Sequence, residues 1–126
     1  VHEIWQNDNT YFFAVHDYFT KDFIGTAKLS FFENNMMRAG IADVGLMVGN
    51  RNFWGKGIGT EIIRILSDYA FKKLHARKLT AGAISGNIAV IKAFKNSGYI
   101  EEGILKKQFY INDTFHDQIL LATFNR

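Results

Sequence analysis

The sequence of 126 residues contains no cysteine and no proline. Without cysteine, neither a disulfide framework nor a thiolate metal site can form, which suits a reducing compartment. No apolar run approaches the length of about 18 residues that a membrane-spanning helix needs, and the opening residues VHEIWQND do not resemble a signal peptide. We therefore expect one soluble, cytoplasmic domain over residues 1–126.

Several other site classes lack their motifs. The four histidines show neither H-E-x-x-H nor any other close ligand spacing, so we expect no metal. With no G-x-S-x-G and no cysteine, an acyl-enzyme mechanism is disfavoured. The net charge is +3, but lysines and arginines are mixed with acids, and a phosphate-bearing small ligand explains this excess as well as nucleic acid would. We expect neither a nucleic-acid nor a membrane partner.

Hydrophobic patterning predicts a mixed α/β domain. Densely apolar and aromatic runs indicate strands, and apolar residues at helical spacing indicate helices. The predicted strands are 11–17, 23–32, 41–48, 78–85, 99–110 and 115–124, and the predicted helices are 58–75 and 87–96. In this β-β-β-α-β-α-β-β order the first two strands form a hairpin, and 78–85 lies parallel to 41–48. Gly45 within its strand indicates a bulge or a close backbone approach.

The most informative stretch is NRNFWGKGIGTEIIRI, residues 50–65, where an apolar strand leads through a glycine-rich turn into a helix. Gly55, Gly57 and Gly59 allow a tight bend and leave backbone N–H groups unshielded. Together with the positive end of the helix dipole, these amides predict an anion site, and phosphate is the most common anion there. The order G-x-G-x-G fits neither the Walker loop nor the dinucleotide fingerprint.

This loop resembles the acetyl-CoA pyrophosphate loop of the GNAT N-acetyltransferase superfamily, Gln/Arg-x-x-Gly-x-Gly/Ala. Trp54 stands at the Gln/Arg position and departs from the pattern, yet WGKGIGTE is similar to the branch of the ribosomal-protein N-acetyltransferases and their small-molecule relatives. A second family segment, Asn-x-x-Ala-x-x-x-Tyr-x-x-x-Gly-Phe, is matched by Asn87, Val90, Phe94, Gly98 and Tyr99.

The resemblance extends over nearly the whole chain and implies a GNAT-like fold. That fold has a central mixed, partly splayed β-sheet flanked by helices. Members usually begin with one more strand and a helical pair, so we expect this part to be missing or truncated. The resemblance also implies acetyl-CoA as co-substrate, with its pantetheine arm paired to the main chain of residues 46–48. The implied cofactor-binding residues are Leu46, Met47, Val48, Arg51, Trp54, Gly55, Lys56, Gly57, Ile58, Gly59, Thr60, Asn87 and Phe94.

Direct acyl transfer to an amine requires a base and an oriented carbonyl. Asp43 is the candidate base, directly or through a water; the competing interpretation is a solvated residue near a strand start. The backbone N–H of Met47 is the candidate that polarises the carbonyl. Family members often protonate the departing thiolate with a Tyr, but Phe94 stands at that position. The acid is therefore left open among Ser85, Tyr99, Tyr110 and solvent.

The resulting hypothesis is an N-acetyltransferase that moves acetyl from acetyl-CoA to a primary amine. The acceptor is a protein N-terminus, a nucleotide-linked amino sugar or another small amine. A polyamine is less attractive, since the chain itself carries net positive charge. The alternative is a catalytically inactive sensor or regulatory module that binds CoA. The sequence leaves open whether the protein is a monomer or a homodimer.

Overall fold

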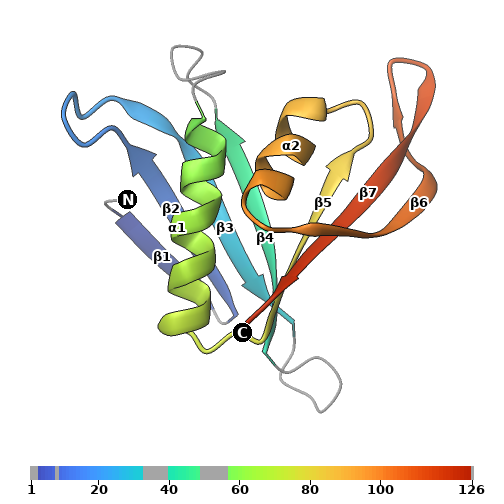
Figure 1. Cartoon of the computed structure of the whole chain (residues 1–126). Coiled ribbons are helices and arrows are strands. Elements are labelled where there is room, and N and C mark those ends of the chain that lie inside the picture. The colour runs from blue at the N-terminus through green and yellow to red at the C-terminus, as the bar shows by residue number, and fades with distance from the viewer. Residues whose placement is uncertain (1–2, 8, 33–39, 49–56, 126) are drawn as a thin grey trace.

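The computed structural model describes residues 3–7, 9–32, 40–48 and 57–125, and the described strands form one seven-stranded sheet in the order β1-β2-β3-β4-β5-β7-β6 (Figure 1). The elements are β1 (Glu3–Asn7), β2 (Thr10–His16), β3 (Phe23–Phe31), β4 (Ile41–Val48), α1 (Ile58–Lys72), β5 (Lys78–Ile84), α2 (Ile88–Asn96), β6 (Ile100–Ile111) and β7 (Thr114–Phe124). The pair β4–β5 is parallel, and the other neighbouring strands are antiparallel. The predicted mixed sheet, the β2–β3 hairpin and the parallel crossover are confirmed.

The predicted element order was wrong in one respect, because a strand precedes the first predicted one. Strand β1 pairs antiparallel with β2, from Glu3 opposite Ala14 to Asn7 opposite Thr10. Its five residues, EIWQN, mix polar and apolar types, and so short a run carries little periodic signal. The observed order is β-β-β-β-α-β-α-β-β.

Helix α1 ends at Lys72, before the predicted end near His75. The N–H of Leu74 turns back to the carbonyl of Tyr69 at 3.3 Å, and His75 has left-handed backbone with φ 58°. When a helix ends in left-handed backbone, the residue there is usually glycine. Here it is His75, so no glycine in the sequence marks the end of the helix. Helix α2, by contrast, begins after Asn87 and ends at Ser97-Gly98 as predicted, with φ 94° at Gly98.

The core lies between the helices and one face of the sheet. Alternate residues of β2, β3 and β4 are buried there, and the ring of Phe13 meets that of Tyr69 on α1 edge to face at 6.0 Å. Figure 1 shows α1 lying across these strands. The fully buried large side chains of this core are Leu29, Ile63, Leu66, Leu79 and Leu121. Neither described helix is long and apolar enough to span a bilayer.

The prediction of a bulge at Gly45 was wrong. Strands β3 and β4 pair without a register shift from Gly25 opposite Val48 to Phe31 opposite Ala42. Lys28 is the cross-strand partner of Gly45, and a Cβ on Gly45 would lie 3.5 Å from Cε of Lys28. The close neighbour of this glycine is therefore the stem of a lysine, rather than another backbone.

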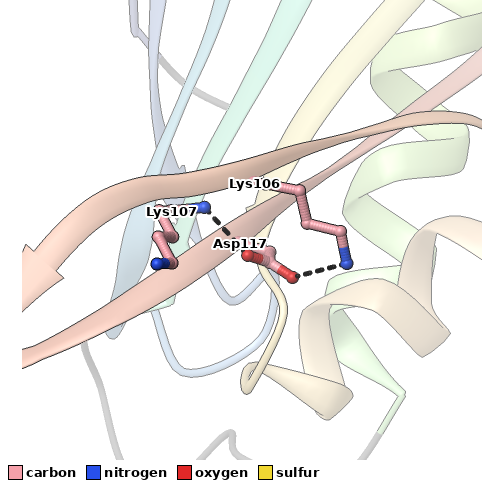
Figure 2. Close-up of polar contacts among 3 residues, drawn as sticks. All are labelled: Lys106, Lys107 and Asp117. Atoms are coloured by element: carbon pink, nitrogen blue, oxygen red, sulfur yellow. Dashed lines mark hydrogen bonds and ion pairs between the residues drawn. The ribbon is translucent and has the colours of Figure 1, made fainter.

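Strand β6 contains a bulge where its register with β7 shifts between Leu105 and Phe109. Figure 2 shows its anchor: Oδ1 of Asp117 accepts the backbone N–H of Lys107 at 2.9 Å, and Oδ2 accepts Nζ of Lys106 at 3.4 Å. These hydrogen bonds, that of Lys107 first, lower the pKa of Asp117. The carbonyl of Asp117 also accepts the N–H of Ser85 at 2.9 Å, so one residue joins the end of β5 to the final hairpin.

Candidate functional site

The main feature of the site is the divergence of β4 from β5. The two strands are paired only at Ile41–Lys78, Ala42–Leu79 and Asp43–Thr80. Beyond this point β4 stays paired with β3, and β5 stays paired with β7 to Ile84. Figure 1 shows the two strands parting toward their carboxyl ends. The β5-facing edge of residues 44–48 has no described strand partner, so its main-chain groups are available to an extended, amide-bearing ligand.

Helix α1 begins beside the open end of this divergence. Its N-cap, Gly57, has left-handed backbone with φ 73° and makes no side-chain cap. The first helical bond runs from the N–H of Glu61 to the carbonyl of Gly57 at 3.1 Å, so the amides of residues 58–60 precede the intrahelical ladder. A Cβ on Gly59 would lie 3.8 Å from the Leu46 side chain, which places this helix end against β4. Free amides at the positive end of a dipole favour an anion.

Helix α2 borders the other side of the divergence. Oδ1 of Asn87 accepts the N–H of Val90 at 3.3 Å and so caps the helix, which leaves the Nδ2 group as the donor available to a ligand. The two helices are joined directly. Nη2 of Arg64 donates to the carbonyl of Asn96 at 2.8 Å, and Oγ of Ser97, which donates to the carbonyl of Ala93 at 2.8 Å, also lies 3.2 Å from the carbonyl oxygen of Thr60.

Asp43 lies at the last paired position before the strands part, and it is partly buried. Its Oδ1 accepts a hydrogen bond from Oγ1 of Thr80 on β5 at 2.9 Å. Burial raises the pKa of Asp43 above its ordinary value, while the Thr80 hydrogen bond and the charge of Lys28 act in the opposite direction. A half-buried carboxylate with an elevated pKa is a stronger base than a solvated one.

Phe94 and Tyr99 lie in the core, each 2% exposed, with their rings edge to face at 4.9 Å. Oη of Tyr99 is 2.8 Å from Oγ of Ser67, and that Oγ donates to the carbonyl of Ile63 at 2.7 Å, so the tyrosine is the donor between them. Burial raises the pKa of Tyr99 to about 12. Of the other acid candidates, Tyr110 is exposed and donates to Oδ1 of Asp113 at 3.4 Å.

The structure brings some of the predicted residues together and does not describe others. Leu46 packs against the core, whereas the side chain of Met47 is 69% exposed. The predicted loop residues Arg51, Trp54, Gly55 and Lys56 lie outside the described residues, and for Val48 only the backbone is described. The first turn of α1 lies against both β4 and α2, since a Cβ on Gly59 would lie 3.8 Å from the side chain of Leu46 and 3.6 Å from that of Ala93. The roles of these residues remain predictions, that of the buried Phe94 included.

A groove of about 620 Å³ crosses β2, β3 and β4 on the face opposite α1. Sequence reasoning missed this groove, and it missed Thr80 and Lys28 as neighbours of Asp43. The alternation of β3 predicts that Lys28 faces away from the core, but the register that sets it beside Gly45 has no local signal. Among the described residues, no three His, Asp or Glu side chains gather as a metal site requires.

Comparison with known proteins gives concordant matches. The domain model described as acetyltransferase (GNAT) domain matches residues 1–100. The chain is 37% identical over 71 residues to the probable N-acetyltransferase YjcK of Bacillus subtilis (strain 168), which is 56% of this chain and 39% of that protein. The chain spans less than half the length of the curated relatives that it matches.

Two solved structures share the fold over nearly the whole chain. The spermidine N-acetyltransferase of Vibrio cholerae in complex with CoA and spermine superposes with a TM-score of 0.81 at 25% identity, covering 93% of this chain and 66% of that chain. The ribosomal-protein-S5-alanine acetyltransferase of Vibrio fischeri superposes with a TM-score of 0.80 at 27% identity, covering 94% and 63%. With most of its length matched by the domain model and a sheet that parts as described, the chain belongs to the GNAT acetyltransferase family.

Proposed function

We propose that this chain holds an N-acetyltransferase site that moves the acetyl group of acetyl-CoA to a primary amine by direct attack. The observation that carries the proposal is the divergence of β4 from β5 beyond Asp43 and Thr80. It leaves a strand edge for an extended ligand, and the N-terminus of α1 stands beside it. No step requires a covalent intermediate on the protein, which agrees with the absence of cysteine.

Acetyl-CoA fits this opening by chemistry at both ends. Its pantetheine arm carries amides that pair with the main chain of residues 46–48 in place of a strand. Its pyrophosphate binds the amides at the start of α1, with the residues that precede Gly57 completing the cradle and Lys56 or Arg51 adding charge. The Nδ2 group of Asn87 donates to the arm from the opposite side.

In the reaction the amine nitrogen attacks the thioester carbonyl, forming the C–N bond. The backbone N–H of Met47 stabilises the oxyanion that develops. The C–S bond then breaks, CoA leaves as a thiolate, and the proton of the amine goes to Asp43, directly or through one water. Thiols ionise near pH 8.5, so the thiolate leaves without prior protonation, and solvent supplies its proton afterwards. A buried Phe94 is compatible with this order of events.

The acceptor is a primary amine, and the relatives suggest two kinds beside the nucleotide-linked amino sugar that the sequence leaves open. The Vibrio cholerae enzyme binds spermine, and the Vibrio fischeri enzyme is named for the alanine of a ribosomal protein. The WGKGIGTE loop favours the ribosomal-protein branch with its small-molecule relatives.

The test uses Gly57→Glu and Gly57→Ala in the full-length protein. Both side chains have open space around Cβ but meet the same backbone cost of about 1 kcal/mol at positive φ. Only Glu brings a negative charge, whose repulsion of roughly 1–4 kcal/mol at 4 Å from a phosphate weakens acetyl-CoA binding by about fivefold or more relative to Ala. Equal affinities in the two variants would remove the α1 terminus from the site.

Turnover is measured by thiol release from acetyl-CoA. Peptides, amino-sugar nucleotides and polyamines serve as acceptors. Amine-dependent release establishes the transferase. Tight binding with no release across the panel would favour the sensor, the alternative that the missing hydroxyl at Phe94 supports.

A further inference from the structure

The groove of about 620 Å³ lies on the face of the sheet to which the Asp43 side chain belongs. Cross-strand partners share a face, and Asp43 is opposite Ser30, Gly45 is opposite Lys28, and Met47 is opposite Thr26. Gly45, Leu46 and Met47 line the groove, so its β4 wall is the stretch beside the proposed thioester. An acceptor in this groove therefore approaches the acetyl group from the side of the candidate base.

Lys28 gives the groove its charge. Among the described residues that line it, Lys28 is the only Lys, Arg, Asp or Glu. Its stem lies over Gly45, which has no side chain to displace it, and its charge acts on Asp43. Asp43 is two residues from Gly45 along β4, a rise of roughly 7 Å, so one small molecule can reach both side chains.

The remaining lining is mainly apolar and aromatic, with Thr26 and His16 as its other polar side chains. Phe12 is 40% exposed on the same rung as Lys28, and Phe23 lies edge to face with His16 at 5.6 Å. Such rings favour a flat or apolar moiety. A polyamine would instead place several positive charges beside Lys28, and the described lining offers no carboxylate to offset them.

We propose that this groove binds an acceptor amine whose scaffold carries an anionic group, phosphate or carboxylate, and a ring or apolar portion, with the anion paired to Lys28. The inference rests on the proposed transferase function and narrows its acceptor to one class. It separates this chain from its spermine-binding structural relative, although the two share the fold.

The experiment compares kcat/KM ratios for the full-length protein and two matched charge reversals. The acceptors are an amino sugar linked to a nucleoside diphosphate, the same sugar unlinked, an aromatic amino acid and spermidine. Lys28→Glu reverses the charge in the groove, and Lys73→Glu reverses an exposed charge at the far end of α1. The first two acceptors differ by the nucleoside diphosphate, the amino acid tests a carboxylate, and the charge reversal at Lys28 separates the effect of the anion from that of the ring.

We expect the wild type to prefer an anionic acceptor over spermidine. Lys28→Glu should lower kcat/KM for that acceptor at least ~10-fold relative to spermidine, while Lys73→Glu leaves the ratio unchanged. Any effect of Lys28→Glu on the pKa of Asp43 acts on every acceptor alike and cancels in the ratio. A preference for spermidine, or an equal loss with all acceptors, overturns the inference.

Binding provides a readout that does not depend on turnover. Calorimetry with the CoA-loaded protein uses a nucleoside diphosphate as a non-reacting probe of the anionic scaffold, and phenylpropionate as a probe of the carboxylate. The groove assignment is supported if either probe binds the wild type and Lys73→Glu but does not bind Lys28→Glu. This support holds even if no acceptor turns over, because a lack of turnover counts only against the transferase function. No binding of either probe to the wild type overturns the assignment.

Discussion

Removal of one hydroxyl group opposite Asp43 should move the pH dependence of catalysis. Oγ1 of Thr80 donates to Oδ1 of Asp43 at 2.9 Å, and this hydrogen bond opposes the rise in the pKa of Asp43 that burial causes. Thr80→Val keeps the β-branched shape and removes the donor. The ionised carboxylate is then less stabilised, so its pKa rises further and a larger share of the enzyme holds a protonated, inactive base at low pH.

The size of the effect follows from the exposure of the pair. A hydrogen bond to a charged group contributes about 1.5–3 kcal/mol when buried, and partial exposure at this site reduces that to about 1 kcal/mol. On the acid limb of the pH profile, kcat/KM should therefore fall ~5-fold, since about 1.4 kcal/mol corresponds to a factor of ten. On the plateau Asp43 is ionised in both proteins, and the rate should be equal or slightly higher because the base is stronger.

The assay is thiol release from acetyl-CoA at saturating coenzyme, with kcat/KM for the acceptor measured across the acid limb. Thr80→Ser keeps the hydroxyl and is the matched control, so its acid limb should coincide with that of the wild type. If Thr80→Val leaves the acid limb in place, or if Thr80→Ser moves it equally, Asp43 is not the titrating base that Thr80 orients.

Two further predictions concern buried ionisable groups. Burial raises the pKa of Asp43, so at neutral pH its charged form destabilises the folded state. Asp43→Asn should therefore be at least as stable as the wild type at neutral pH, although it loses turnover. In melting curves, the stability difference between Asp43→Asn and the wild type should shrink as the pH falls toward 3.8. Because the pKa of Tyr99 is raised from 10.0 to about 12, its contribution to stability is lost between these values as pH rises. Tyr99→Phe should remove that alkaline loss in melting curves, cost about 1 kcal/mol at neutral pH and keep full turnover; reduced turnover would return Tyr99 to the site.

Local signals predicted most of the fold. The apolar run 41–48 coincides with β4, and Asn87 and Ser97-Gly98 mark both ends of α2 because an N-cap side chain and a C-terminal glycine act within a few residues. The two features that were not predicted are the early end of α1 and the strand β1, and both depend on residues that carry no capping or glycine signal. His75 adopts left-handed backbone despite its Cβ, and β1 is held by its pairing with β2 rather than by its own composition.

The candidate site residues were predicted from two local segments, the strand–turn–helix stretch and the segment that begins at Asn87. The glycine turn and Asp43 both belong to the strand–turn–helix stretch, so their pattern was readable. Thr80 is 37 residues from Asp43, and the two meet through the register of a parallel pair. Lys28 reaches Gly45 through the register of an antiparallel pair. Register is set by the packing of whole strands, so neither neighbour had a local signature.

The separation of β4 from β5 follows from how each strand pairs with its outer neighbour. Each diverging strand is held on its outer edge by a longer partner: β4 has seven register pairs with β3, β5 has seven with β7, and the two share three with one another. The hydrogen bond from Arg64 to Asn96 joins α1 to α2, and Oγ of Ser97 lies close to the carbonyl of Thr60. An extended ligand therefore meets an edge already in strand geometry, and little of its binding free energy is spent on ordering the protein. This preorganisation also keeps Asp43 and Thr80 at the closed end, where the last shared pair fixes the base relative to the edge that the thioester occupies.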